Sequence, residues 1–70
     1  MQLHAKISLR KAISSDVLES VNSYLKQFGK DKHTIEHFDG AVFIYVSNDR
    51  DAALLKENFP DVVADIEELY

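Results

Sequence analysis

Residues 49–70 read DRDAALLKENFPDVVADIEELY, and the proline within this stretch divides it into two parts. The part before Pro60 has apolar residues in a short amphipathic run that ends at Phe59. Because proline lacks the amide that a helix interior needs, we expect the helix to end at or near Phe59. The part after Pro60 is branched and apolar at several positions, which indicates a final strand that returns to a sheet.

The beginning of the chain carries a regular strand pattern. Apolar side chains alternate with polar ones from residue 2 to residue 10, and the apolar members are Leu3, Ala5, Ile7 and Leu9. This period of two predicts a strand with one apolar and one polar face.

A first helix is predicted to follow this strand. Ser14, Ser15 and Asp16 are candidate N-caps, with Glu19 three residues after Asp16 in an arrangement that resembles a capping box. Apolar residues then recur at helical spacing, namely Val17, Val21, Leu25 and Phe28. Gly29 suits a left-handed C-cap.

The middle of the chain predicts a hairpin. Residues 33–38 and 41–46 form two strand-like runs, and Asp39-Gly40 between them suits a type I′ turn. Residues 42–46 are apolar on both faces, as expected of a central strand that is covered on one side and only partly on the other. Residues 47–49 are candidate caps for the second helix.

The order strand, helix, strand, strand, helix, strand predicts an α+β fold, the ferredoxin-like α/β-plait, as a single domain over residues 1–70. Two helices would cover one face of a four-stranded antiparallel sheet, against the first strand's apolar face and Val42, Ile44 and Val46. The other face would stay open, and we expect it to show Phe43, Tyr45, His4, Lys6 and Ser8. Open aromatic surface is where we expect a partner to bind.

Composition excludes several classes of function. The chain has no cysteine, so disulfides, thiolate catalysis and cysteine-based zinc sites are excluded. Its net charge is −4. Only Arg50 and Lys56 are basic after residue 33, against nine acids, which argues against nucleic acid as a direct partner. No segment is long and apolar enough to span a membrane or to serve as a signal peptide, so we expect a cytoplasmic protein.

The sequence offers no constellation for catalysis or for binding a metal or cofactor. Glu67 and Glu68 are adjacent on a strand and point to opposite faces, so they cannot act together as an acid–base pair. His33 and His37 lie about 13 Å apart on one face of a strand, too far to share a metal ion. The serines lack a matched histidine and acid, and there is no glycine-rich phosphate loop. We therefore expect neither an enzyme nor a metal or cofactor site.

Two stretches resemble the propeptide-type inhibitors of subtilisin-like serine proteases. Residues 35–46 are similar to that family's second and third strands, and residues 53–68 are similar to its second helix, proline turn and acidic closing strand. The order of elements matches over the whole chain.

The resemblance implies an inhibitor or folding helper of a subtilisin-like protease. The open sheet face would lie on two protease helices, with Phe43 and Tyr45 at sheet-face positions. Glu67 and Glu68 match the acids that cap those helices. Leu69 and Tyr70 match the start of the tail that enters the active site. A tail of two residues spans at most about 7 Å, so we expect weaker inhibition than a full propeptide gives.

Two other interpretations stay open. If Pro60 only kinks the second helix, residues 61–70 would be an acidic helical end, as in small phage or stress regulators that bind DNA-handling proteins and mimic nucleic-acid charge. The plait could also form a homodimer through its open face.

Overall fold

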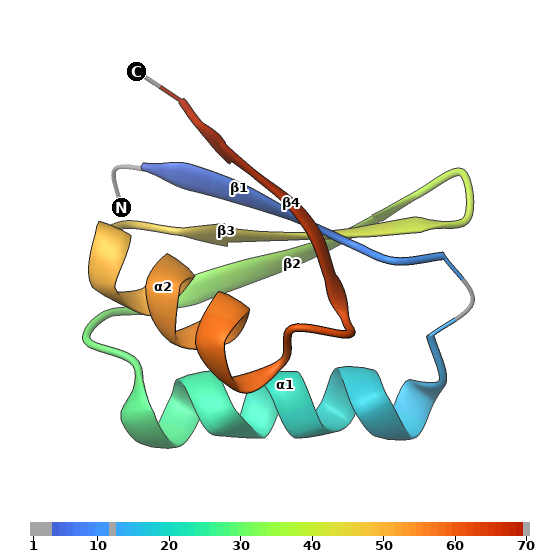
Figure 1. Ribbon diagram of the computed structural model, residues 1–70, viewed down its shortest axis with the longest axis horizontal. Helices are drawn as coiled ribbons and strands as arrows, with labels where there is room; N and C mark the ends of the chain where they lie inside the picture. Colours follow the sequence, from blue (N-terminus) through green and yellow to red (C-terminus); the bar gives the residue numbers. More distant parts are fainter. Residues whose placement is uncertain (1–3, 12, 70) are drawn as a thin grey trace.

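The computed structural model describes residues 4–11 and 13–69, and within them the chain forms four strands and two helices (Figure 1). The elements follow in the order β1 (Ala5–Leu9), α1 (Ser15–Phe28), β2 (His33–Phe38), β3 (Ala41–Val46), α2 (Asp49–Asn58) and β4 (Val63–Glu68). The strands form one antiparallel sheet in the spatial order β2-β3-β1-β4. This is the ferredoxin-like α/β-plait, so the predicted fold class is confirmed.

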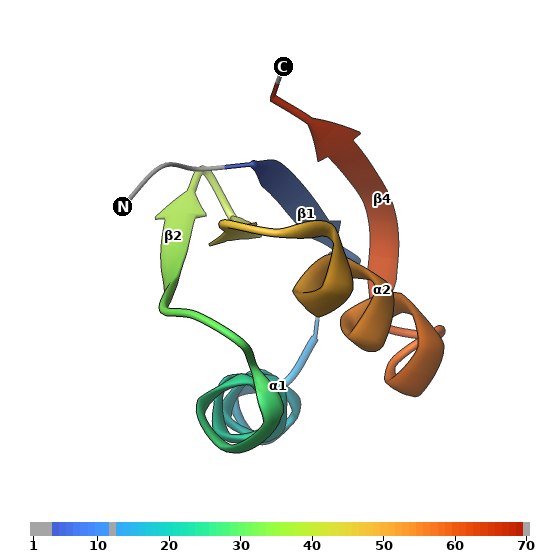
Figure 2. The same cartoon turned by 90° about the vertical axis from the view of Figure 1, so that its left-hand side faces the viewer.

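Both helices lie on one side of the sheet, and neither covers the other side (Figures 1 and 2). The apolar face of the central strands is buried under them, and Ile7 and Ile44 are both 0% exposed. The remaining buried apolar residues are Ala5, Leu9, Val21, Leu25, Val46, Ala52, Leu55 and Val63. Because successive side chains of a strand point to opposite faces, the residues between these core positions face away from the helices.

The chain around Pro60 follows the sequence expectation. Helix α2 ends at Asn58, and the N–H of Phe59 still donates to the Leu55 carbonyl at 2.8 Å. A tight turn follows, in which the N–H groups of Val62 and Val63 each lie 3.0 Å from the Phe59 carbonyl. The chain then continues as β4, antiparallel to β1. The strand predicted after Pro60 is therefore confirmed.

The turn between β2 and β3 also has the predicted conformation. Asp39 has a φ of 50° and Gly40 a φ of 80°. A type I′ turn needs positive φ at both central positions, and its twist matches that of the flanking strands. The turn aligns β2 with β3 so that Glu36 lies opposite Phe43.

The two helices are short and have side-chain caps. Ser14 is the N-cap of α1, and its hydroxyl oxygen accepts from the Val17 N–H at 3.2 Å. Asn48 is the N-cap of α2 and accepts in the same way from the Asp51 N–H at 2.9 Å. Neither described helix is both long and apolar enough to cross a membrane.

The predicted left-handed conformation of Gly29 is wrong. Its φ is −67° and its ψ is 145°, which any residue can adopt. The glycine is needed because the chain leaves α1 very close to its last turn: a Cβ at Gly29 would lie 2.4 Å from the Leu25 carbonyl oxygen. The requirement is for space and not for positive φ.

Candidate protein-binding face of the sheet

The side of the sheet that faces away from the helices is defined by the strand register. Lys6 of β1 lies opposite Tyr45 of β3 on one side and Glu67 of β4 on the other. Residues directly opposite each other in antiparallel strands share a face. The Lys6 Nζ also lies 4.3 Å from the centre of the Phe43 ring. Lys6, Phe43, Tyr45 and Glu67 therefore share one face, which we call the open face.

Aromatic side chains occupy the centre of the open face, as predicted. Phe43 and Tyr45 are only partly buried. Phe38, at the end of β2, is 72% exposed. It lies opposite Ala41 of β3, which is on the same side of that strand as Phe43, so Phe38 belongs to the open face. Exposed aromatic surface of this kind is typical of the centre of a protein–protein interface.

Exposed acids line both edges of the open face. Glu36 of β2 lies opposite Phe43, while Asp65 and Glu67 of β4 lie opposite Ser8 and Lys6. Glu36 and Asp65 are not among the binding residues that the sequence predicts. Their alternation within each strand is visible in the sequence, but their position beside the aromatic residues depends on the register between strands.

Glu67 and Glu68 lie on opposite faces of the sheet, as their adjacent positions on a strand predict. Glu67 lies on the open face, whereas Glu68 lies opposite Ala5, whose side chain is buried on the helix side. The carboxylate of Glu68 instead lies close to His4 and Asp49. Only one of the two predicted acids therefore accompanies the aromatic residues.

The end of the chain continues the pairing of β4 with β1. The Leu69 N–H donates to the His4 carbonyl at 2.9 Å, and Leu69 is 40% exposed. Tyr70, the other predicted tail residue, lies outside the described residues.

His4 differs from its expected position. The sequence predicted its side chain on the open face with Lys6, but its Nε2 hydrogen-bonds the Oδ1 of Asp49, the first residue of α2. Helix α2 begins shortly after β3 ends, and that end of β3 pairs with the start of β1. The connection therefore brings the Asp49 carboxylate close to His4, the residue directly before β1.

The two histidines of β2 lie on its helix side and have different surroundings. His33 is partly buried, and its Nε2 lies 2.6 Å from the Asn22 Oδ1 of α1. Burial lowers the pKa of His33, the positive charge of Lys26 lowers it further, and Asp51 acts in the opposite direction. His37 is exposed.

Asp51 is the one fully buried charged residue among those described. Its carboxylate accepts from the Lys30 N–H at 2.9 Å and from the Asn48 side-chain amide at 3.2 Å. These bonds fasten the loop after α1 to the start of α2. These hydrogen bonds give Asp51 a structural role. The sequence carries a signal for it, because the N-cap Asn48 is followed three residues later by an acid, which resembles a capping box.

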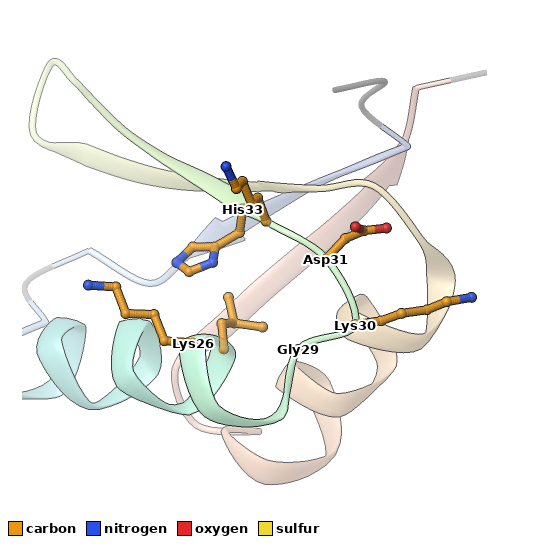
Figure 3. Close-up of a pocket in the computed structure, with 7 residues that line it drawn as sticks. Lys26, Gly29, Lys30, Asp31 and His33 are labelled. Carbon is orange, nitrogen blue, oxygen red and sulfur yellow. The ribbon is translucent and has the colours of Figure 1, made fainter.

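A pocket of about 480 Å³ lies between the end of α1 and the start of β2. Its lining residues are Leu25, Lys26, Gly29, Lys30, Asp31, Lys32 and His33. Figure 3 shows Lys26 and Lys30 extending away from each other, so their charges do not converge on one bound group.

No family model, curated protein or solved structure matches this chain.

Proposed function

We propose that this chain is a non-catalytic protein-binding module that docks a folded partner onto its open face. The observation that carries the proposal is the combination of partly exposed aromatic side chains, Phe43 and Tyr45, with acids along both edges of the same face. A partner that buries the aromatic rings would gain apolar contact area, and the acidic edges would select a basic or dipolar surface. The same acids would repel a nucleic-acid backbone.

The partner we propose is a subtilisin-like serine protease, which the chain would inhibit or help to fold. The order of elements and the resemblance of residues 35–46 and 53–68 to propeptide-type inhibitors support this choice. In that family the sheet lies on two helices of the protease. The free amides and the dipole at a helix N-terminus favour a carboxylate. Glu67 shares its face with the aromatic residues, which is the arrangement that such a contact requires.

The alternative of an acidic regulator has less support. It depended on a helical end after Pro60, whereas residues 63–68 form a strand. A homodimer through the open face stays an outcome of the test below.

The first test measures binding and inhibition with a bacterial subtilisin. We expect the chain to inhibit hydrolysis of a peptide substrate, and the double variant Phe43→Ala with Tyr45→Ala to lose inhibition while unfolding cooperatively. Phe28→Ala is the matched control, because Phe28 is 50% exposed but lies on α1, away from the open face. Absence of inhibition at high micromolar concentration, also in a form extended after Tyr70, would reject the protease as partner. A dimer that the double variant dissociates would then identify the open face as a self-association surface.

The second test separates the two acids. A charge-assisted contact at a helix N-terminus contributes about 1 kcal/mol, and up to about 2 kcal/mol when partly buried. Glu67→Gln should therefore weaken inhibition by roughly five- to thirtyfold, less so at high salt. Glu68→Gln should have no comparable effect, because Glu68 lies on the other face. Equal losses in both variants would contradict docking through the open face.

A further inference from the structure

Three side chains that could ligate a metal ion converge at the end of the sheet where β1 begins and β4 ends. They are His4, which precedes β1, Asp49, the first residue of α2, and Glu68, the last residue of β4. One imidazole nitrogen and two carboxylate oxygens all lie within 4.8 Å of one another. The residues are far apart in the sequence, so only the fold brings them together.

We propose that His4, Asp49 and Glu68 form a binding site for a divalent transition-metal ion, for which Zn²⁺ is the matching probe. Imidazole nitrogen and carboxylate oxygen are both ordinary zinc ligands, at bond lengths of about 2.0–2.2 Å. Three protein ligands leave the fourth tetrahedral position to water or to a group of another molecule. The site lies outside the open face and does not depend on the proposed inhibitory function.

The backbone holds His4 in place before any metal binds. Its N–H donates to the Val46 carbonyl of β3 at 2.8 Å, and its carbonyl accepts from the Leu69 N–H at 2.9 Å. Its side chain is 18% exposed. The backbone of His4 is therefore fixed, and its imidazole is already held by the hydrogen bond to Asp49. This preorganisation lowers the entropic cost of binding.

The two carboxylates supply negative charge for the ion, and their side chains can move to give the ligand spacing that the ion requires. Tetrahedral zinc holds its ligand atoms about 3.3 Å apart, so the cluster must contract slightly around the ion and open the hydrogen bond between His4 and Asp49. The Asp49 side chain is 75% exposed and can rotate to do this. Two carboxylates this close repel each other, and a divalent cation between them reverses that repulsion.

Metal binding at this site should stabilise the fold. The unfolded chain does not bring residues 4, 49 and 68 together, so the ion binds the folded state preferentially and raises the unfolding temperature. It would also tie together the first strand, the second helix and the last strand.

The test is a calorimetric titration of the full chain with ZnCl₂ at neutral pH in a non-chelating buffer. The visible absorption of bound Co²⁺ reports the coordination geometry. We expect one ion per chain. Loss of an outer-shell partner typically weakens metal binding about 10–100-fold, and loss of a ligand should cost at least as much. His4→Gln, Asp49→Asn and Glu68→Gln should each do so and remove the rise in unfolding temperature.

Matched controls use the same residue types elsewhere on the surface. His37→Gln and Glu57→Gln change exposed residues outside the cluster and should leave zinc affinity unchanged. Glu68→Gln is conservative at an exposed position, so its unfolding in the presence of chelator should match that of the unchanged chain. The proposal is overturned if zinc does not bind below millimolar concentration. It is also overturned if the cluster variants bind as tightly as the controls.

Discussion

The two faces of the sheet are built from alternate residues of the same strands, yet they have opposite physical roles. On the helix side Ile7 and Ile44 are fully buried. On the open face their sequence neighbours Lys6 and Phe43 stay partly exposed and contact each other through the ammonium group and the ring. Strand pairing fixes the backbone of both faces equally, so the difference lies in what covers the side chains. The covered face supplies the buried core, and the open face keeps its side chains partly exposed.

The two faces should differ most in how much a truncated side chain lowers the free energy of unfolding. Ile44→Ala removes buried methyl and methylene groups and should lower the free energy of unfolding by about 2–5 kcal/mol. A domain of this length is expected to have only about 4–10 kcal/mol in total. Phe43→Ala, one residue away on the open face, should cost clearly less. Urea unfolding of both variants measures this, and equal losses would mean that the open face belongs to the core.

The next largest effect should come from Asp51, the buried carboxylate on the helix side. Asp51→Ala removes the acceptor of the Lys30 N–H and one of the two acceptors of the Asn48 side-chain amide. A buried donor left in this way costs about 1–3 kcal/mol. Glu57→Ala, at an exposed position of α2, is the control and should change stability by at most about 0.5 kcal/mol. If Asp51→Ala lowers the free energy of unfolding no more than the control does, Asp51 does not stabilise the contact between the loop after α1 and the start of α2.

On the open face, the contact between Lys6 and Phe43 should contribute only modestly to stability. Lys6→Gln should cost about 0.5–1 kcal/mol, which is the range for a cation–π pair near the surface. A double-mutant cycle with Phe43→Leu separates the pairwise contact from the effects of each substitution. A coupling energy of zero would show that the open face contributes nothing to stability through this pair.

The smallest expected effect is a pH dependence that originates on the helix side. The pKa of His33 is lowered from 6.5 by burial and by Lys26, so just below pH 6.5 the unfolded chain binds more protons than the folded one. The contribution of His33 is fully present above about pH 6.5. It is lost progressively as the pH falls from there towards the lowered pKa of the folded state. Stability measured from pH 5 to pH 8 should show a shallower slope in His33→Gln. His37→Gln, at an exposed position, should keep the original slope, and an unchanged slope in both variants would contradict the role of His33.

The sequence alone determined the order and type of the elements, because these follow from local rules. Alternation defines β1 as a strand, and the missing amide of Pro60 ends α2. Asp39 and Gly40 adopt the positive φ that the turn requires. The alternation within β3 was also enough to assign Phe43 and Tyr45 to the face away from the helices, and that within β4 separates Glu67 from Glu68.

Other features are decided only by the tertiary structure, because they depend on contacts between segments that are distant in the sequence. The register of β1 with β3 and β4 sets Glu67 across from Lys6, and the docking of α2 brings Asp49 to His4. The same docking buries Asp51 against the loop after α1. The chain leaves α1 so close to the Leu25 carbonyl that a side chain at position 29 would not fit, which explains the glycine there. Periodicity describes which residues share a face within one element. The pairing of those faces is selected by the packing of the whole core, because no local pattern encodes which distant segments meet.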